Sequence, residues 1–588
     1  MLSKITLIEP KAPSSHVYSM VNMPRLGLPL IGSHLQSLGY EVNLIYGSSD
    51  SIRMADIANS DLVGISTTTS TAPEAYRIAR YASERRIPVV LGGAHATFMV
   101  EEALENGDYV CRGEADFTFG QLLDHLKRGE VPLTVPGVSF YHQGRLINNP
   151  LPEPVNLETC AIPDLTLFSN SDSFSTYPVM TSRGCPFNCT FCSVTAMFGR
   201  KYRCRSIEQV LEELAPYVNK SVFFCDDNFA ANRSRTKELL RGMIDRQVIP
   251  EFWGAQVRTD AARDEELLDL MQQAGCKMVY VGFESINPLT LESFNKMQGV
   301  SDIEYCIEKF HEYGIMLHGM FVFGGDDDTV KTINDTVDFA LDNRIDTAQF
   351  LFLTPLPGTS TFQQMEAENR LLTRDWSLYD GHHVVFRPRL MSPLELQVET
   401  MKGFRRFYSA RNLLDNLLLT GKQAVAFRAA GYYLTRKWER ENGWYYKALE
   451  RQQEGIRPQQ RGFELQKTIE SFKQKLPGRN KPQETLDLRV CEIDGGFRVE
   501  LIGYLNKFNM KKAFRMVRNA LPETHMDLTI SINQLNFDSE EVFKQFVQEV
   551  NRLSAKVRSV YLKVGMSRSR LNQVLEKYNL GIPYFELS

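Results

Sequence analysis

Three cysteines lie within eight positions of the sequence, in the stretch TSRGCPFNCTFCSVT at residues 181–195. With 10 cysteines among 588 residues, chance would give such a triple on the order of 0.003 times. The other seven are scattered along the chain, a usage that indicates a reducing environment in which neighbouring thiols hold metal or do chemistry. We therefore predict that Cys185, Cys189 and Cys192 act together as metal ligands.

Two kinds of metal centre compete for these thiols. A structural zinc site usually takes four ligands in paired sets, and the sequence offers no second pair beside the triple. Thiolates are the normal ligands of iron–sulfur clusters, and three of them would leave one iron of a four-iron cluster open to a substrate or cofactor. The spacing favours a 4Fe-4S cluster, with zinc as the alternative.

Composition narrows the class of protein. The chain is 43% hydrophobic and 23% charged, with a net charge of −4, which gives no sign of a nucleic-acid partner. It has no apolar run of about 18 residues, so we expect no membrane-spanning helix. The first residues, MLSKITLIEP, have the pattern of a strand and lack the layout of a signal peptide. We expect a cytoplasmic protein of several domains.

Residues 1–150 alternate short apolar strands with helical stretches, which predicts a doubly wound parallel sheet followed by a hairpin at 137–150. Ligands of such sheets bind at the carboxyl ends of the strands, which here carry STTTST, GGAHAT and RGEAD. The first strand runs into EPKAPSSH, and the missing G-x-G-x-x-G excludes a nicotinamide dinucleotide domain. The strands are expected at 4–9, 41–46, 62–67, 88–93 and 109–113.

After a proline-bearing linker at 151–175, a second β/α series fills residues 176–392. Its six strands suit a partial TIM-like (β/α)6 barrel, in which active-site residues gather at the carboxyl ends of the strands. The cysteine triple follows the first of these strands. Chemically distinctive residues follow the others: Asp226, Asp227, Arg258, Glu284, Gly324, Gly325 and the turn TPLPGTS, which contains Pro357.

The remaining residues are predicted to form a helical cap at 393–470, a linker at 471–483 and a small α/β domain at 484–588. The cap helices are basic and rich in aromatics, so they could cover a hydrophobic substrate, contact a membrane surface, or simply pack on the barrel. The last domain resembles anti-sigma-factor-antagonist-like domains in its order of strands and helices, which implies an interaction or docking role.

The motif C-x₃-C-x₂-C on the loop after a first barrel strand resembles the signature of the radical S-adenosylmethionine (SAM) enzymes. A preceding doubly wound domain without a dinucleotide fingerprint resembles the cobalamin-binding, methyltransferase-like branch of that superfamily. The resemblance implies a 4Fe-4S cluster whose open iron chelates SAM. It also implies that SAM cleavage gives a 5′-deoxyadenosyl radical, which takes hydrogen from an unreactive carbon.

The resemblance also implies roles for single residues. Phe191 would lie near the adenine of SAM, Asp226 or Asp227 would accept hydrogen bonds from the amino group, and Arg258 and Glu284 would bind the carboxylate and ribose. Gly324, Gly325 and Pro357 would border the adenine. The alternatives are that the aspartates cap the helix that begins near NRSRTKELL, that Arg258 pairs with Asp260 on the surface, and that the glycines only make turns.

For cobalamin, the sequence lacks the motif D-x-H-x-x-G, whose histidine binds cobalt in other cobalamin proteins. The resemblance implies that hydroxyl and glycine residues at the strand ends hold the cofactor instead. His95 would touch the corrin or only hydrogen-bond a loop, and the whole domain could be a scaffold that has lost its ligand. The residues expected to bind are Ser66, Thr67, Thr68, Gly92, Gly93, His95 and Glu114.

The segment DWSLYDGHHVVF follows the barrel, and a similar segment in the family borders the substrate cavity. We expect Tyr379 and His382 to contact the substrate. Adjacent histidines on a strand point apart, so His382 and His383 are not expected to bind one metal.

Three functions are consistent with these residues. The first is cobalamin-dependent methylation of an unactivated carbon of a small-molecule or lipid substrate, with a flavodoxin or ferredoxin as electron donor. The second is radical cyclisation, oxidation or carbon–carbon coupling at the same site. The third is a non-catalytic corrinoid or redox sensor.

Overall fold

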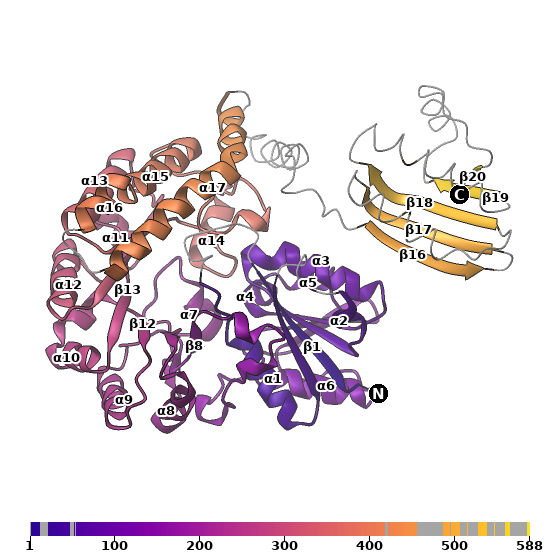
Figure 1. The fold of residues 1–588 in the computed structure, drawn as a ribbon, viewed down its shortest axis with the longest axis horizontal. Coiled ribbons are helices and arrows are strands. Elements are labelled where there is room, and N and C mark those ends of the chain that lie inside the picture. The colour runs from indigo at the N-terminus through magenta and orange to yellow at the C-terminus, as the bar shows by residue number, and fades with distance from the viewer. Residues whose placement is uncertain are drawn as a thin grey trace. The chain divides into compact units, whose positions relative to one another are not determined.

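The computed structural model describes residues 2–11, 21–47, 52, 54–417 and 422–454, and near the C-terminus five strands with residues 514 and 546. The chain forms two compact units, Met1–Ile469 and Glu470–Ser588 (Figure 1). The two units are described separately below.

The N-terminal part of the first unit is a seven-stranded sheet in the order β2-β1-β3-β4-β5-β6-β7. The first five strands pair in parallel, and β6 and β7 form an antiparallel hairpin at one edge. One buried cluster contains residues of α1 and α6 and another contains residues of α3, so helices cover both faces of the sheet. The doubly wound sheet is thus confirmed. The strands are β1 (Lys4–Pro10), β2 (Glu41–Gly47), β3 (Leu62–Ser66), β4 (Val89–Gly92), β5 (Tyr109–Cys111), β6 (Val138–His142) and β7 (Arg145–Asn148), and the helices include α1 (Gly27–Ser37), α3 (Ala72–Ser83), α4 (Gly93–Phe98), α5 (Val100–Leu104) and α6 (Thr118–Lys127).

The predicted partial barrel is a six-stranded parallel sheet in the order β15-β14-β13-β12-β11-β8. Alternate side chains of its strands join the helices in one large buried cluster. The strands are β8 (Tyr177–Val179), β11 (Ser221–Phe224), β12 (Phe252–Val257), β13 (Cys276–Glu284), β14 (Met316–Phe323) and β15 (Thr347–Phe352), and the helices are α8 (Ile207–Leu214), α9 (Arg233–Asp245), α10 (Glu265–Gln273), α11 (Pro288–Ser293), α12 (Val300–Glu312), α13 (Val330–Asp342) and α14 (Ser360–Ala367).

Three further helices, α15 (Pro393–Phe407), α16 (Ala410–Leu417) and α17 (Lys422–Glu454), follow the barrel. Helix α15 packs on α13, β15 and α17. The Tyr408 hydroxyl donates to the carbonyl of Ala348 at 2.7 Å and accepts its N–H at 3.0 Å. Tyr408 thereby occupies the free edge of β15. None of the helices in the described part of the chain has the length and hydropathy that a membrane crossing needs.

The second unit contains a five-stranded sheet in the order β16-β17-β18-β19-β20. Strands β16 and β17 are antiparallel and the other neighbours are parallel. The short strand β20 was not predicted. The helices predicted between these strands and the linker at 471–483 lie outside the described residues, and the predicted domain boundaries stay predictions. The strands are β16 (Leu486–Ile493), β17 (Gly496–Leu505), β18 (Asp527–Phe537), β19 (Ser559–Val564) and β20 (Phe585–Leu587).

Candidate functional site

The three clustered cysteines lie on a loop, residues 184–202, that is closed at its base by a short antiparallel pair. Strand β9 (Ser182–Arg183) pairs with β10 (Arg203–Cys204), and helix α7 (Ser193–Phe198) begins directly after Cys192. We call this segment the cysteine loop. The cysteine loop follows the first barrel strand, β8. All three thiols on it are partly buried and therefore sheltered from solvent.

Burial sets the chemistry of these thiols. It raises the pKa of Cys192 to about 11 and also raises the pKa of Cys185. Backbone N–H groups of Phe187 and Val194 oppose the shift by donating to the two sulfurs. A bound cation would stabilise the thiolates against this burial. Among the described residues no three side chains converge tightly enough to hold a single metal ion, whereas cluster ligands are spread around a larger body.

The far side of the cysteine loop is fastened to the barrel. The N–H of Thr190 donates to the carbonyl of Phe294 at 3.2 Å, and the Asn295 amide donates to the carbonyl of Asn188 at 2.9 Å. Phe191 packs edge-on against Phe294 with ring centroids 5.1 Å apart. Phe191 therefore lies at the loop's anchor on the segment that follows β13.

The two adjacent aspartates after β11 have different hydrogen-bond partners. Asp226 is 2% exposed and accepts hydrogen bonds from both N–H groups of Thr181 and Ser182, at 2.8 and 2.6 Å, and from the Thr181 hydroxyl at 2.9 Å. Burial raises its pKa to about 6. Asp227 accepts the Gly184 N–H at 2.9 Å and interacts electrostatically with Cys185 and Cys192. Asp227 is therefore the carboxylate that faces the cysteine loop.

The helix-cap alternative for these aspartates is wrong, because the side chain of Asn232 caps α9 by accepting the N–H of Arg235. Arg258 is 8% exposed, and its guanidinium lies 3.7 Å from the ring centroid of Phe187 in the cysteine loop. Its Nε is 3.8 Å from Asp260. Arg258 is thus turned toward the loop and is not an exposed surface ion pair.

Three other residues predicted to bind SAM make their contacts within the protein. Glu284 lies in the left-handed region, with φ of 62°, and its Oε1 is 2.7 Å from Nζ of Lys296. The N–H groups of Gly324 and Gly325 both donate to Asp328, at 3.0 and 2.9 Å. A Cβ on Gly324 would lie 2.7 Å from Phe386. Tight packing and a turn therefore explain these two glycines.

The turn that contains Pro357 meets the N-terminal sheet's helices. Pro357 is buried, and its neighbour Gly358 has φ of 88° and approaches Phe98 so closely that a Cβ would lie 2.5 Å from that ring. The structure thus places Pro357 next to a residue that contacts α4.

The segment after the barrel is buried rather than open. Tyr379 is 3% exposed, and its hydroxyl donates to the carbonyl of Thr373 at 2.7 Å. The Nδ1 atom of His382 lies 3.0 Å from the carbonyl oxygen of Asp380, and the two side-chain oxygens of Asp380 are each 3.0 Å from Nδ1 of His383. The structure gives both predicted substrate residues contacts inside the protein.

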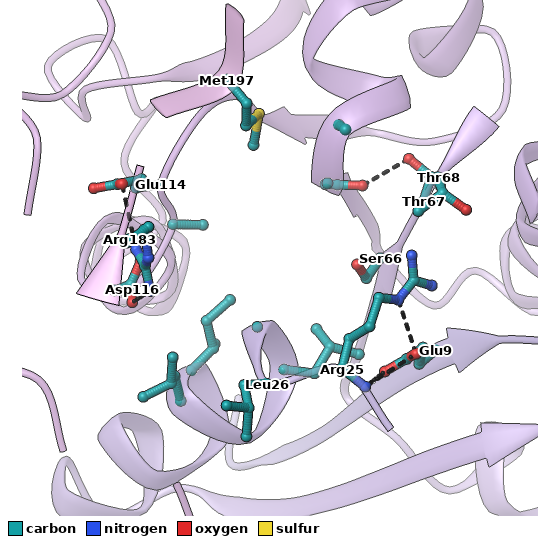
Figure 2. A pocket seen from close by; sticks show the side chains of 18 of the residues that line it. Glu9, Arg25, Leu26, Ser66, Thr67, Thr68, Glu114, Asp116, Arg183 and Met197 are labelled. Carbon is teal, nitrogen blue, oxygen red and sulfur yellow. Dashed lines mark hydrogen bonds and ion pairs between the residues drawn. The ribbon is translucent and has the colours of Figure 1, made fainter. Parts of the chain in front are cut away.

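A cavity of about 400 Å³ lies between the N-terminal sheet and the cysteine loop. One wall comes from the carboxyl ends of β3 and β4 and another from α7 and the residues around it. Figure 2 shows Ser66, Thr67, Thr68 and Met197 among the residues that line the cavity. Apolar side chains of α1, α6 and α7 line much of the rest. The predicted residues that line it are Ser66, Thr67, Thr68, Gly92, Gly93, Glu114 and Asp227.

The strand-end loops of this cavity brace one another. The Thr67 hydroxyl donates to the carbonyl of Gly92 at 2.7 Å and accepts the Ala96 N–H at 3.1 Å. His95 does not line the cavity. It is 1% exposed, with its two ring nitrogens 3.4 Å from the Thr69 hydroxyl and 3.3 Å from Glu102. Its position fits the alternative in which it only hydrogen-bonds the neighbouring loop.

Ion pairs at the cavity wall were not predicted. Arg183 pairs with Asp116, Arg203 with Glu114, and Arg25 with Glu9. Figure 2 shows Arg183 with its carboxylates on one side of the cavity and Ser66, Thr67 and Thr68 on the other. The partners are far apart in sequence, so no local pattern could have identified these pairs.

Two family models match the chain. The Radical SAM superfamily model matches residues 179–340 and the B12 binding domain model matches residues 19–123. An uncharacterised methyltransferase of Pyrococcus horikoshii is 33% identical over a region that covers 66% of this chain and 88% of the relative. The chain belongs to the cobalamin-binding radical SAM family. It is a radical SAM enzyme, and its cofactors are a 4Fe-4S cluster, SAM and cobalamin.

Another relative of this radical SAM enzyme is the bacteriochlorophyllide d C-12(1)-methyltransferase of Chlorobaculum tepidum. It is 29% identical over 70% of this chain and 89% of its own length. The solved structure of TsrM, a radical SAM methyltransferase of Kitasatospora setae with cobalamin and a 4Fe-4S cluster bound, has a TM-score of 0.57. It is 16% identical and covers 75% of this chain and all of its own, so this likeness shows the fold.

The residues of this cobalamin-binding radical SAM enzyme fit the cofactors. The cysteine loop supplies three sheltered thiols in one short segment, as a cluster with an open iron requires. The cavity offers hydroxyl and glycine residues on one wall and apolar side chains such as Leu26, Phe119 and Met197 on the others. Such a mixture suits a corrinoid, whose ring is largely apolar and whose rim is polar.

Proposed function

We propose that the protein transfers methyl groups from SAM, by way of cobalamin, to an unactivated carbon of a small-molecule substrate. The observation that carries this proposal is that one cavity is bounded both by the strand ends of the N-terminal sheet and by the cysteine loop. A methyl donor bound at the loop and a methyl carrier bound at the sheet would therefore be neighbours. The methyltransferase names of two relatives support the proposal.

When bound, the cofactors supply the radical and methyl-transfer chemistry. The protein's own part is to bind and orient them. The Asp227 carboxylate would accept hydrogen bonds from the amino group of SAM, and the buried guanidinium of Arg258 would face its carboxylate. The Nε of Arg258 has no hydrogen-bond partner among the described residues, so it keeps a donor for such a ligand.

The strand-end loops would hold the corrinoid. The hydroxyls of Ser66 and Thr68 and the backbone at Gly92 and Gly93 line the wall where amide and phosphate oxygens need hydrogen-bond donors. Leu26, Leu30 and Phe119 line the same cavity and would exclude water from the ring, which strengthens the polar contacts around it.

The test uses the full chain, purified without oxygen and reconstituted with iron, sulfide and hydroxocobalamin. Dithionite replaces the flavodoxin or ferredoxin that we propose as electron donor. SAM labelled in its methyl group should transfer label to cobalamin, and deoxyadenosine should accumulate. Deoxyadenosine without label on cobalamin would point to radical cyclisation, oxidation or coupling, and the absence of both products would favour the sensor.

Matched cysteine variants make this test specific. Cys192→Ala should lose the cluster and both products. Cys306→Ala removes a buried thiol from α12, outside the site, and should keep them. A Cys192→Ala protein that still forms deoxyadenosine would refute the assigned role of the cysteine loop. The lipid substrate and the membrane contact of residues 393–470 stay predictions.

A further inference from the structure

Two arginines face each other at the base of the cysteine loop. In the β9–β10 pair Arg183 lies directly opposite Arg203, and the two residues are only 8% and 9% exposed. Like charges directly opposite each other destabilise a strand pair. The base of the loop can therefore persist only if something else neutralises both guanidinium groups.

Two carboxylates from the N-terminal sheet do this. Arg183 donates from both terminal nitrogens to the two oxygens of Asp116, each at 3.0 Å. Arg203 donates to both oxygens of Glu114, at 2.8 Å for one of them, and also to the carbonyl of Val155 at 2.7 Å. Both contacts are bidentate, the arrangement with the greatest geometric specificity for arginine. We call the two pairs the double clamp.

The double clamp is buried on both sides. Glu114 and Asp116 are 7% and 8% exposed, and Glu114 also accepts the Val155 N–H at 2.8 Å. Separating such a pair leaves uncompensated charges out of water, which is strongly unfavourable.

The double clamp connects the two cofactor regions. Glu114 and Asp116 follow β5 and line the corrinoid cavity, while Arg183 lines the same cavity and precedes Gly184, which bonds Asp227. Two residues after Arg183 comes Cys185. A displacement of the N-terminal sheet would therefore pull directly on the loop that carries the thiols. Figure 2 shows Arg183 beside Glu114 and Asp116.

We propose that the double clamp is a positioning device that keeps the corrinoid-binding sheet and the cysteine loop at one fixed separation throughout the reaction. The sheet does not swing between a methyl-loading and a methyl-delivering position. This inference rests on the proposed function for its purpose, but the geometry it asserts can be measured without any turnover.

The first experiment measures that geometry. Nitroxide labels are introduced through unnatural amino acids at Glu84 on the N-terminal sheet side and Glu265 on α10, both exposed, and the distance between them is measured by pulsed electron paramagnetic resonance. Wild-type protein should give one narrow distribution that SAM and hydroxocobalamin leave unchanged. A second distance, or a shift on adding either ligand, would overturn the proposal whether or not methyl transfer is observed.

The second experiment breaks the clamp. Asp116→Asn keeps the shape of the side chain and removes its charge, so the distance distribution should broaden and the ratio of methylcobalamin to deoxyadenosine should fall about tenfold. Arg183→Lys keeps the charge, so its distance distribution and its product ratio should lie between those of Asp116→Asn and wild type. Glu208→Gln breaks an ion pair with Arg246 that is exposed on the barrel helices, and it should match wild type.

The outcomes separate the two proposals. If Asp116→Asn does not fold, the distance distributions of Arg183→Lys and of wild-type protein still test the clamp. A narrow distribution and an unchanged product ratio in both clamp variants would refute the clamp and leave the methyltransferase proposal standing. Failure of wild-type protein to load methyl groups on cobalamin would refute the proposed function, while the label distances would still test the clamp.

Discussion

A Cβ atom added to Gly93 would lie 2.5 Å from the carbonyl oxygen of Thr67 and 2.8 Å from its amide nitrogen. Gly93 also has φ of 87°, in the left-handed region. The loops after β3 and β4 can therefore touch at the wall of the cavity beside the cysteine loop only because residue 93 has no side chain.

Gly93→Ala should force these two loops apart and weaken cobalamin binding at least tenfold. Bound cobalamin after reconstitution and gel filtration measures the effect. Gly39→Ala is the matched control, because Gly39 has φ of 86° with nothing within 4 Å of the added Cβ. It should cost about 1 kcal/mol of backbone strain and leave cobalamin binding intact. Equal binding by both variants would contradict the steric argument.

Substitutions of Asp226 and Asp227 should have different effects, because we expect Asp226 to hold the backbone before the cysteine loop and Asp227 to bind SAM. Asp226→Ala removes three hydrogen-bond acceptor contacts to Thr181 and Ser182 and should reduce the iron content after reconstitution. Asp227→Asn can still accept the Gly184 N–H, so it should keep its iron. If Asp227 binds SAM as proposed, loss of its charge should weaken SAM binding about tenfold, or about 1.4 kcal/mol, in calorimetry of the reconstituted protein. The reverse pattern would assign the roles the other way round.

His318, on β14, should make stability depend on pH. Burial lowers its pKa from 6.5 to about 4, partly offset by Gln349. Between these values the unfolded chain binds a proton and the folded chain does not, so stability rises with pH across this window and is lost as pH falls from 6.5 to about 4. The contribution is about 3 kcal/mol. His318→Gln should flatten the difference in Tm between pH 5 and pH 7; an unchanged difference would show that other groups dominate.

Tyr408→Phe should expose the edge of β15. The hydroxyl both donates to and accepts from the backbone of Ala348, and its loss leaves a buried N–H and carbonyl unpaired at a cost of about 1–3 kcal/mol. Thermal unfolding should show a lowered Tm. Tyr433→Phe on α17, where the side chain is 55% exposed, removes the same hydroxyl and should change Tm little.

Much of the fold could be predicted because alternating strands and helices follow from local patterns of apolar residues. The cysteine loop could be predicted equally well, since three cysteines in one short segment can be recognised without reference to the rest of the chain. Asp226 and Asp227 could not be told apart, because they are adjacent carboxylates whose hydrogen-bond partners lie 43 to 45 positions earlier in the chain. Only the folded structure shows which of the two lies beside the cysteine loop.

Long-range pairs mark the limit of sequence reasoning. Arg183 and Asp116 are separated by 67 positions. Both lie in stretches that the sequence singles out, TSRGCPFNCTFCSVT and RGEAD, but nothing in either stretch shows that the two residues pair. His95 and His382 were predicted to contact ligands from their residue type and position, and the structure shows in addition that both are buried. Residue type predicts what a side chain can do, but its burial and partners decide whether that chemistry is available.

The fastening of the cysteine loop also bears on how the protein matures. Its base is tied by Arg183 and Arg203 and its far side by Asn188 and Thr190, none of which needs iron. We therefore expect the cysteine loop to take its shape when the polypeptide folds. Inserting iron and sulfide then requires little further ordering of the backbone, unlike in small domains that fold only around their metal.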